Sequence, residues 1–319
     1  MAGKKTQSMN EVADPTFETY RQACLEGRIE FVTFHPSYSY EEFIEGLTAD
    51  LGEGNNSSES LRYTIKDGLF KKLCARALIA AMPEKTKPEG TGWKAAYEAY
   101  EKYLKSEKTS KIQWDAAPKY VLIIDEINRG DISKILGELV TLLEADKRLA
   151  AGTELVVKLP LSQEDFSVPQ NIYIIATMNT ADRSIALLDV ALRRRFGFIS
   201  MDPDLDLLLD DEKNGDNIQS MKNEGGGTWD LFKQSVDDLK KLNEEIAKDK
   251  SLGKDKKIGH SFLFNVTNKK DLDFAIKYEI IPLVDEYCYG NEEKKSSLLS
   301  NLNYFSKDLN PKKAKNGKN

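Results

Sequence analysis

Midway along the chain lies the run Lys119-Tyr-Val-Leu-Ile-Ile-Asp125, which is nearly continuous in apolar residues and ends in a carboxylate. Such a run is typical of a strand buried on both faces of a parallel sheet. Asn171-Ile-Tyr-Ile-Ile-Ala-Thr177 repeats the pattern. Helical spacing predicts helices from Ile132 to Leu143 and from Leu187 to Arg195, and a short strand follows from Phe196 to Ser200. The alternation predicts an α/β fold with a mostly parallel sheet sandwiched by helices.

The residues before this region predict a strand from Glu30 to Phe34 and a short helix from Tyr40 to Gly46. Residues 50–60 are polar and rich in Gly, Ser and Asn, which predicts a surface loop. Two amphipathic helices are expected next, one from Leu69 to Leu78 and one from Trp93 to Leu104.

The character of the sequence changes after Pro203, where a polar and acidic stretch precedes predicted helices from Trp229 to Lys248 and from Phe274 to Tyr287. We therefore expect four parts: an N-terminal remnant (1–28), an α/β core (29–202), a smaller helical domain (203–305) and a disordered tail (306–319).

Composition narrows the function classes. The 319 residues carry 46 Lys plus Arg against 52 Asp plus Glu, a formal charge of −6, which argues against a free-standing nucleic-acid binder. Three dispersed cysteines and two histidines make a zinc site or a disulfide framework improbable. No apolar run reaches the length of about 18 residues that a membrane span needs, so we expect a cytoplasmic protein with no membrane partner.

The acidic end of the first buried run is the first candidate site. Open α/β sheets bind ligands at the carboxyl ends of their strands, where Asp125 would hold Mg²⁺ and Glu126 would orient or deprotonate an attacking water. A strand that ends in Asp-Glu merely for solubility is the plainer alternative. If the two buried strands are neighbours, Asn179 would reach the same water, although an isolated asparagine there is more often a turn residue.

Arg193-Arg194-Arg195 places three cations in one turn at the end of a predicted helix. Guanidinium groups suit phosphate because they are planar, permanently charged and able to donate two parallel hydrogen bonds. Basic residues also favour helix C-termini through the helix dipole, but three in succession exceed what a cap requires.

Several motifs together resemble the AAA+ module of McrB-like subunits, the GTPases of 5-methylcytosine-specific, modification-dependent restriction systems, within the dynein-related AAA class. The central motifs are Asp125-Glu-Ile-Asn-Arg129, Thr177-Met-Asn-Thr-Ala-Asp-Arg-Ser184 and Ala191-Leu-Arg-Arg-Arg-Phe196. Lys257-Ile-Gly-His-Ser-Phe262 is similar to part of that family's helical lid, which corresponds here to 203–305. The likeness runs from about Ile29 to about Gly290.

The resemblance assigns roles by position. Asp125 and Glu126 match the Walker B carboxylates, Asn179 the sensor asparagine, and Asp182 and Arg183 the extended sensor motif. Arg194 and Arg195 are the candidates for arginine fingers that complete a neighbouring subunit's site, and His260 is a candidate nucleotide contact in the lid. The same resemblance implies Mg²⁺ and GTP or ATP, a ring that is commonly hexameric, an McrC-like nuclease subunit as partner, and DNA handled by the assembly.

One part of the family pattern does not occur in these residues. A phosphate-binding loop of the form Gly-x-x-x-x-Gly-Lys-Thr is expected upstream of Phe31, and the nearest trace is Gly3-Lys4-Lys5-Thr6. We therefore expect a copy truncated at its N-terminus whose 319 residues alone bind nucleotide weakly and are inactive in hydrolysis. The alternative function is a nucleotide-free interaction protein that docks on an intact ring, and a DNA-binding protein without enzymatic activity is a weaker third.

Overall fold

The computed structural model describes residues 15–50, 62–106, 112–181 and 190–300, together with Leu302 and Phe305. The chain divides between Gly197 and Phe198 into two compact units, and the sequence had suggested a boundary near 203. Nearly all of the predicted loop at 50–60, part of the helix predicted from Leu187 and the tail from residue 306 lie outside the described residues.

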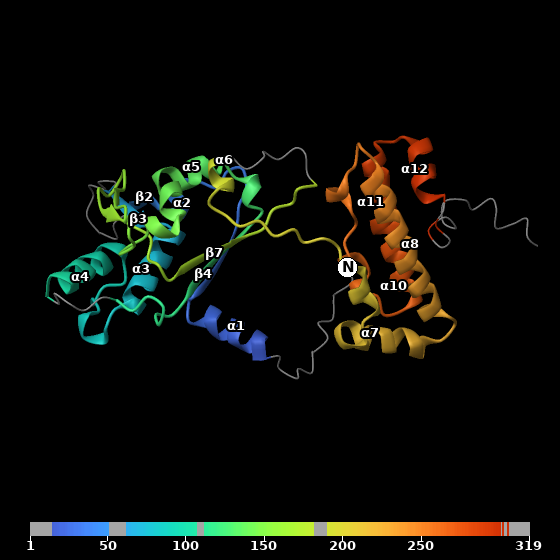
Figure 1. Ribbon diagram of the computed structural model, residues 1–319, viewed down its shortest axis with the longest axis horizontal. Coiled ribbons are helices and arrows are strands. Elements are labelled where there is room, and N and C mark those ends of the chain that lie inside the picture. Colours follow the sequence, from blue (N-terminus) through green and yellow to red (C-terminus); the bar gives the residue numbers. More distant parts are fainter. Residues whose placement is uncertain are drawn as a thin grey trace, which may run out of the picture. The chain divides into compact units, whose positions relative to one another are not determined.

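The sheet of the first unit consists of β1 (Ile29–Thr33), β4 (Tyr120–Asp125) and β7 (Ile172–Ala176), which appear as the central strands of that unit in Figure 1. Their order is β1-β4-β7, and both pairings are parallel. The predicted parallel sheet is therefore confirmed. Because the strands run in the same direction, the carboxyl ends of β4 and β7 lie at the same edge of the sheet.

Helices cover one face of this sheet among the described residues. They are α2 (Tyr40–Phe43), α3 (Leu69–Ala81), α4 (Trp93–Ser106) and α5 (Ile132–Leu136), while α1 (Pro15–Leu25) lies on the other side in Figure 1. Leu122 and Ile124 point into the covered face and are buried, whereas Tyr173 and Ile175 on the other face are 50% and 57% exposed. The expectation of burial on both faces was wrong for this part of the chain, because burial alternates along β4 and β7.

Two antiparallel hairpins were not predicted. One pairs β2 (Glu45–Asp50) with β3 (Arg62–Asp67), and the other pairs β5 (Val157–Lys158) with β6 (Asp165–Phe166). The helix predicted from Tyr40 to Gly46 was wrong at its end, since α2 stops at Phe43 and the next residues enter β2. Long-range contacts decide this, because the Glu45 carboxylate accepts hydrogen bonds from the backbone N–H groups of Leu161 (2.9 Å) and Ser162 (3.0 Å).

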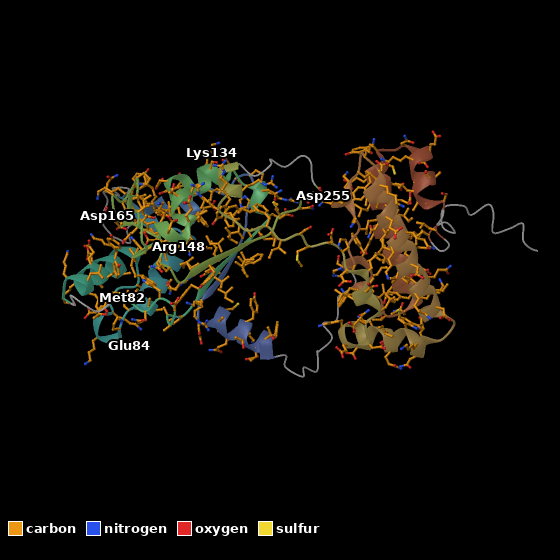
Figure 2. All side chains as sticks on the ribbon, in the orientation of Figure 1. Met82, Glu84, Lys134, Arg148, Asp165 and Asp255 are labelled. Atoms are coloured by element: carbon orange, nitrogen blue, oxygen red, sulfur yellow. The ribbon has the colours of Figure 1, made fainter. Side chains whose placement is uncertain are left out.

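The segment after β4 also differs in detail from its predicted form. The helix expected from Ile132 to Leu143 is α-helical only to Leu136 and continues as a 3₁₀ helix from Gly137 to Leu143. Gly137 has φ of 51°, a conformation that glycine adopts without strain and that ends the α-helix. Arg148, labelled in Figure 2, donates hydrogen bonds to the carbonyl groups of Leu143 and Ile172 and so ties this helix to the start of β7.

The second unit is helical and has its own core, which includes Phe232, Leu239 and Ile276. Its α-helices are α7 (Asp211–Glu224), α8 (Thr228–Lys248), α9 (Ser261–Phe264), α10 (Lys269–Phe274), α11 (Ile281–Cys288) and α12 (Glu292–Leu299), with a π-helical stretch at Ala275–Ile280. The helices predicted over 229–248 and 274–287 are confirmed. The described residues that join the units form a short α6 (Val190–Arg193) but no strand at 196–200, so that predicted strand was wrong.

A buried ion cluster holds the two hairpins against α3. The Lys71 ammonium is fully buried and lies 3.0 Å from Glu45, 2.8 Å from Asp67 and 2.8 Å from Glu164. Burial alone would raise the pKa of Glu45, but hydrogen bonds from Ser162 and Lys71 outweigh it and hold the pKa below its ordinary value. The Lys71 ammonium therefore forms ion pairs with carboxylates from β2, from β3 and from the β5–β6 hairpin.

Replacing Lys71 by methionine leaves these carboxylates without their cation in a site of low dielectric constant. We predict that Lys71→Met lowers the free energy of unfolding by about 3 kcal/mol or more, measured by urea denaturation. The matched control is Lys66→Met, since Lys66 is exposed on β3 and a surface change there costs at most about 0.5 kcal/mol. A loss below about 1 kcal/mol in Lys71→Met would contradict the role given to the cluster.

Candidate active site

The turn that follows β4 has an unusual backbone. Asp125 is the last residue of the strand, and Glu126 adopts φ of 54° and ψ of 47°, in the left-handed region. For a residue other than glycine this costs roughly 1 kcal/mol, so neighbouring contacts must stabilise it. Two backbone hydrogen bonds take part: the Ile127 N–H donates to the Thr177 carbonyl (2.9 Å), and the Arg129 N–H donates to the Glu126 carbonyl (2.9 Å).

The Thr177 side chain connects the two carboxylate residues. Its hydroxyl donates to Oδ1 of Asp125 at 2.6 Å and accepts from the backbone N–H of Glu126 at 3.2 Å. A hydroxyl has one donor and two acceptor lone pairs, so both bonds form at once. The end of β7 therefore fixes the position of the Asp125 carboxylate and the direction of the Glu126 backbone.

A second link joins the same two strand ends. The side-chain amide of Asn128 is buried and donates to the backbone carbonyl of Asn179 at 3.2 Å. Oδ1 of Asn179 accepts from the Ala181 N–H at 3.0 Å. The Nδ2 amide of Asn179 is the group that can donate a hydrogen bond outward.

The carboxylate of Glu126 forms an ion pair within the described residues. Its Oε2 lies 3.2 Å from Nε of Arg129, three residues along the 3₁₀ turn Ile127–Arg129. Both side chains are partly exposed, so the ion pair contributes little to stability. Its effect is on orientation, since it directs one oxygen of Glu126 toward Arg129.

The donor set at this corner fits Mg²⁺. In nucleotide sites Mg²⁺ takes one or two carboxylates and completes its shell with water and substrate phosphates. Asp125 offers Oδ2, because Oδ1 is engaged by Thr177. The described residues contain no group of three or more His, Cys, Asp and Glu side chains placed to hold a metal. An ion bound by Asp125 would take further oxygens from water and from a bound triphosphate.

Comparison with known families fits this arrangement. The model of the AAA domain, dynein-related subfamily, matches residues 18–196, and the model of the McrB alpha-helical lid domain matches residues 234–296. The chain belongs to the dynein-related AAA family. Its first unit is the AAA domain, and its second unit contains the McrB-type lid.

Two curated relatives come from restriction enzymes. The EcoKMcrB subunit of the type IV methyl-directed restriction enzyme of Escherichia coli K12 is 33% identical over 291 residues, which cover 86% of this chain and 50% of the relative. The YdiS component of the type II restriction enzyme BsuMI of Bacillus subtilis 168 is 34% identical over 88 residues, covering 25% of this chain and 26% of the relative. The AAA chain thus spans at most about half the length of these relatives.

The structure distinguishes the two arginines that were expected to act together. Arg195 is 17% exposed and pairs with Glu144 of the same chain at 2.8 Å. Arg194 is exposed, and no hydrogen bond or ion pair is found for it within the described part of the AAA chain. Arg194 is therefore presented to the surroundings, whereas Arg195 stabilises the fold of its own AAA domain.

The remaining predicted site residues are located separately. Asp182 and Arg183 lie outside the described residues. His260 belongs to the second unit, where its Nδ1 accepts a hydrogen bond from the Asp204 N–H at 3.3 Å and its ring makes an edge contact with Phe264. The Nδ1 atom is thus used within the lid, which leaves Nε2 as the atom that a ligand would meet.

Sequence reasoning missed Thr177, Asn128 and Glu144 as contributors to the site. A signal for Thr177 was present, because it ends the second apolar run just as Asp125 ends the first. In the parallel register Ile124 lies opposite Ala176, so Asp125 and Thr177 are the next residues on each strand. Glu144 carried no such signal, since its partner Arg195 is distant in the sequence.

The described surface also contains a hollow of about 520 Å³ away from this corner. It lies between the β2–β3 hairpin and α3, and Glu30, Glu41, Lys72 and Arg76 line it together with other residues. Side chains of both charges line it, and Arg76 pairs with Glu30 at 2.5 Å. The hollow therefore offers no preference for an anion or a cation.

The different surroundings of the two arginines predict different effects on stability. Arg195→Ala removes a partly buried ion pair and should lower the free energy of unfolding by about 1 kcal/mol or slightly more. Arg194→Ala should change it by no more than about 0.5 kcal/mol. Urea unfolding of the two variants side by side provides the measurement, and equal losses in both would contradict the assignment.

Proposed function

We propose that this chain supplies the water-activating half of a nucleoside-triphosphatase site, in an AAA subunit that drives DNA translocation for the nuclease of a restriction system. The observation that carries the proposal is the pairing of β4 with β7, with Asp125, Glu126 and Asn179 at their joined carboxyl ends. The family match and the McrB relative support the system to which the subunit would belong.

Each residue at the corner has a distinct part in the proposed hydrolysis. Glu126 orients the attacking water and accepts its proton, and the Nδ2 amide of Asn179 donates a hydrogen bond to the same water or to the terminal phosphate. Asp125 holds Mg²⁺, mostly through water. When bound, that ion neutralises charge on the phosphates of GTP or ATP.

Phosphate binding must come from groups other than these carboxylates. Asp125 and Glu126 are negative and repel a triphosphate, so backbone N–H groups and a lysine of a phosphate-binding loop are needed. The 319 residues contain no Gly-x-x-x-x-Gly-Lys-Thr segment. We therefore propose that these residues alone bind nucleotide weakly, and that hydrolysis appears when such a segment is supplied ahead of Ile29.

Arg194 is the proposed contact to a neighbouring subunit. An exposed guanidinium adds catalytic power when it enters a site that already holds the phosphates, because it stabilises charge in the transition state. We propose a ring of AAA subunits, with hexamers as the expected size, in which Arg194 completes the next subunit's site. Each subunit then contributes one arginine finger, Arg194, while Arg195 stabilises the fold of its own subunit.

Three further residues are proposed to support the nucleotide site. Asp182 and Arg183 would act beside Asn179, and His260 would contact the nucleotide from the lid through Nε2.

In this proposal, restriction of DNA is an activity of the assembled ring together with its nuclease subunit. The ring converts hydrolysis into DNA movement, and an McrC-like nuclease subunit cuts the DNA. The acidic balance of the chain, with a formal charge of −6, agrees with DNA being gripped by the assembly rather than by this chain alone.

The decisive experiment compares GTP and ATP hydrolysis by the chain with a phosphate-binding strand and loop joined ahead of Ile29. Glu126→Gln should lower kcat by about 100-fold or more, because a general base contributes at least that factor, while nucleotide affinity stays of the same order.

Mixing Glu126→Gln subunits with Arg194→Ala subunits should restore part of the activity, because some interfaces then combine an intact arginine finger with an intact general base. Unchanged turnover in Glu126→Gln would refute the assignment, and hydrolysis absent from the parent would favour the nucleotide-free docking protein.

A further inference from the structure

The Thr177 hydroxyl makes two side-chain hydrogen bonds at the carboxyl end of β7. Thr177 follows the last residue of β7 and is exposed, so its side chain adds little to the core. Its backbone already pairs with the turn, since its N–H donates to the Ile124 carbonyl (2.9 Å) and its carbonyl accepts from the Ile127 N–H (2.9 Å). The two side-chain bonds are additional to this pairing.

We infer that Thr177 is a positioning residue for the proposed hydrolysis, because its hydroxyl selects which oxygen of Asp125 faces the metal and holds the backbone turn that presents Glu126. This inference rests on the proposed function. The hydroxyl occupies Oδ1 of Asp125 at 2.6 Å and leaves Oδ2 for the ion and its water shell.

The second bond of the hydroxyl acts on Glu126. The Glu126 N–H has Thr177 Oγ1 as its acceptor at 3.2 Å, and the residue is held at φ of 54°. Without this acceptor, the left-handed conformation loses one of the contacts that offset its cost. The backbone of Glu126 would then be free to change conformation. Its carboxylate would turn away from the proposed water position, even where it kept its ion pair with Arg129.

A valine at position 177 keeps the shape and the β-branch of threonine but removes the hydroxyl. A serine keeps the hydroxyl and removes the methyl group. Thr177→Val should therefore disturb the corner, whereas Thr177→Ser should preserve it. Since the residue is exposed, neither change overfills the core, and equal melting temperatures for the two variants would verify the fold.

The first readout is amide hydrogen exchange in the 319-residue chain, without nucleotide or metal. In Thr177→Val the Glu126 amide should exchange at least about tenfold faster, because it loses its acceptor. The Ile127 amide is the internal control, since its acceptor is the unchanged backbone carbonyl of Thr177. Exchange at Glu126 that matches the parent, or that rises equally at Ile127, would overturn the inference.

The second readout is the Mg²⁺ dependence of hydrolysis in the chain with a phosphate-binding segment. Thr177→Val should raise the Mg²⁺ concentration for half-maximal rate by about tenfold, whereas Thr177→Ser should stay close to the parent. A purely structural residue would lower kcat without moving this midpoint, so an unchanged midpoint would overturn the positioning role. If the parent itself shows no hydrolysis that depends on Glu126, the proposed function fails and the inference fails with it, whatever the exchange data show.

Discussion

Parallel strands leave their carboxyl ends at one edge of a sheet, and in this protein β4 and β7 are hydrogen-bonded neighbours. This single pairing brings Asp125 and Glu126 to the residues that follow β7. Thr177 and Asn128 then join the two strand ends through side-chain bonds of 2.6 Å and 3.2 Å. Loss of the pairing would separate the carboxylate of Asp125, the proposed metal ligand, from the donor amide of Asn179, so every proposed catalytic role depends on it.

The two units contribute in different ways. The AAA domain carries the strand ends and both arginines, and the McrB-type lid has a separate core and holds His260 through a bond from the Asp204 N–H. No helix within the described residues is long and apolar enough to cross a membrane. Within the AAA domain, Lys71 stabilises the fold through buried ion pairs and Arg195 through a partly buried one, whereas Arg194 is exposed.

Sequence patterns predicted the elements whose cause is local. The apolar runs that form β4 and β7 and the helical spacing of α3, α4 and α8 are properties of the segments themselves, and these predictions are confirmed. The β2–β3 hairpin was missed because Glu45 belongs to a cluster with Lys71 and the backbone near Leu161, which are distant in the sequence. The contact between Asp125 and Thr177 also depends on a long-range feature, the pairing of β4 with β7, so the sequence alone could not predict it. The sequence did show the residue types at the end of each strand.

The central claim is that Asp125, Glu126 and Asn179 meet one magnesium-bound triphosphate. The most direct test is a structure of the assembled subunit, with a phosphate-binding loop present, bound to Mg²⁺ and a non-hydrolysable triphosphate. The account predicts that the ion's water shell contacts Oδ2 of Asp125, that Oδ1 still receives the Thr177 hydroxyl, and that Nδ2 of Asn179 and the Glu126 carboxylate flank the terminal phosphate. Density for the triphosphate at any other edge of the sheet, with this corner empty, would contradict the account.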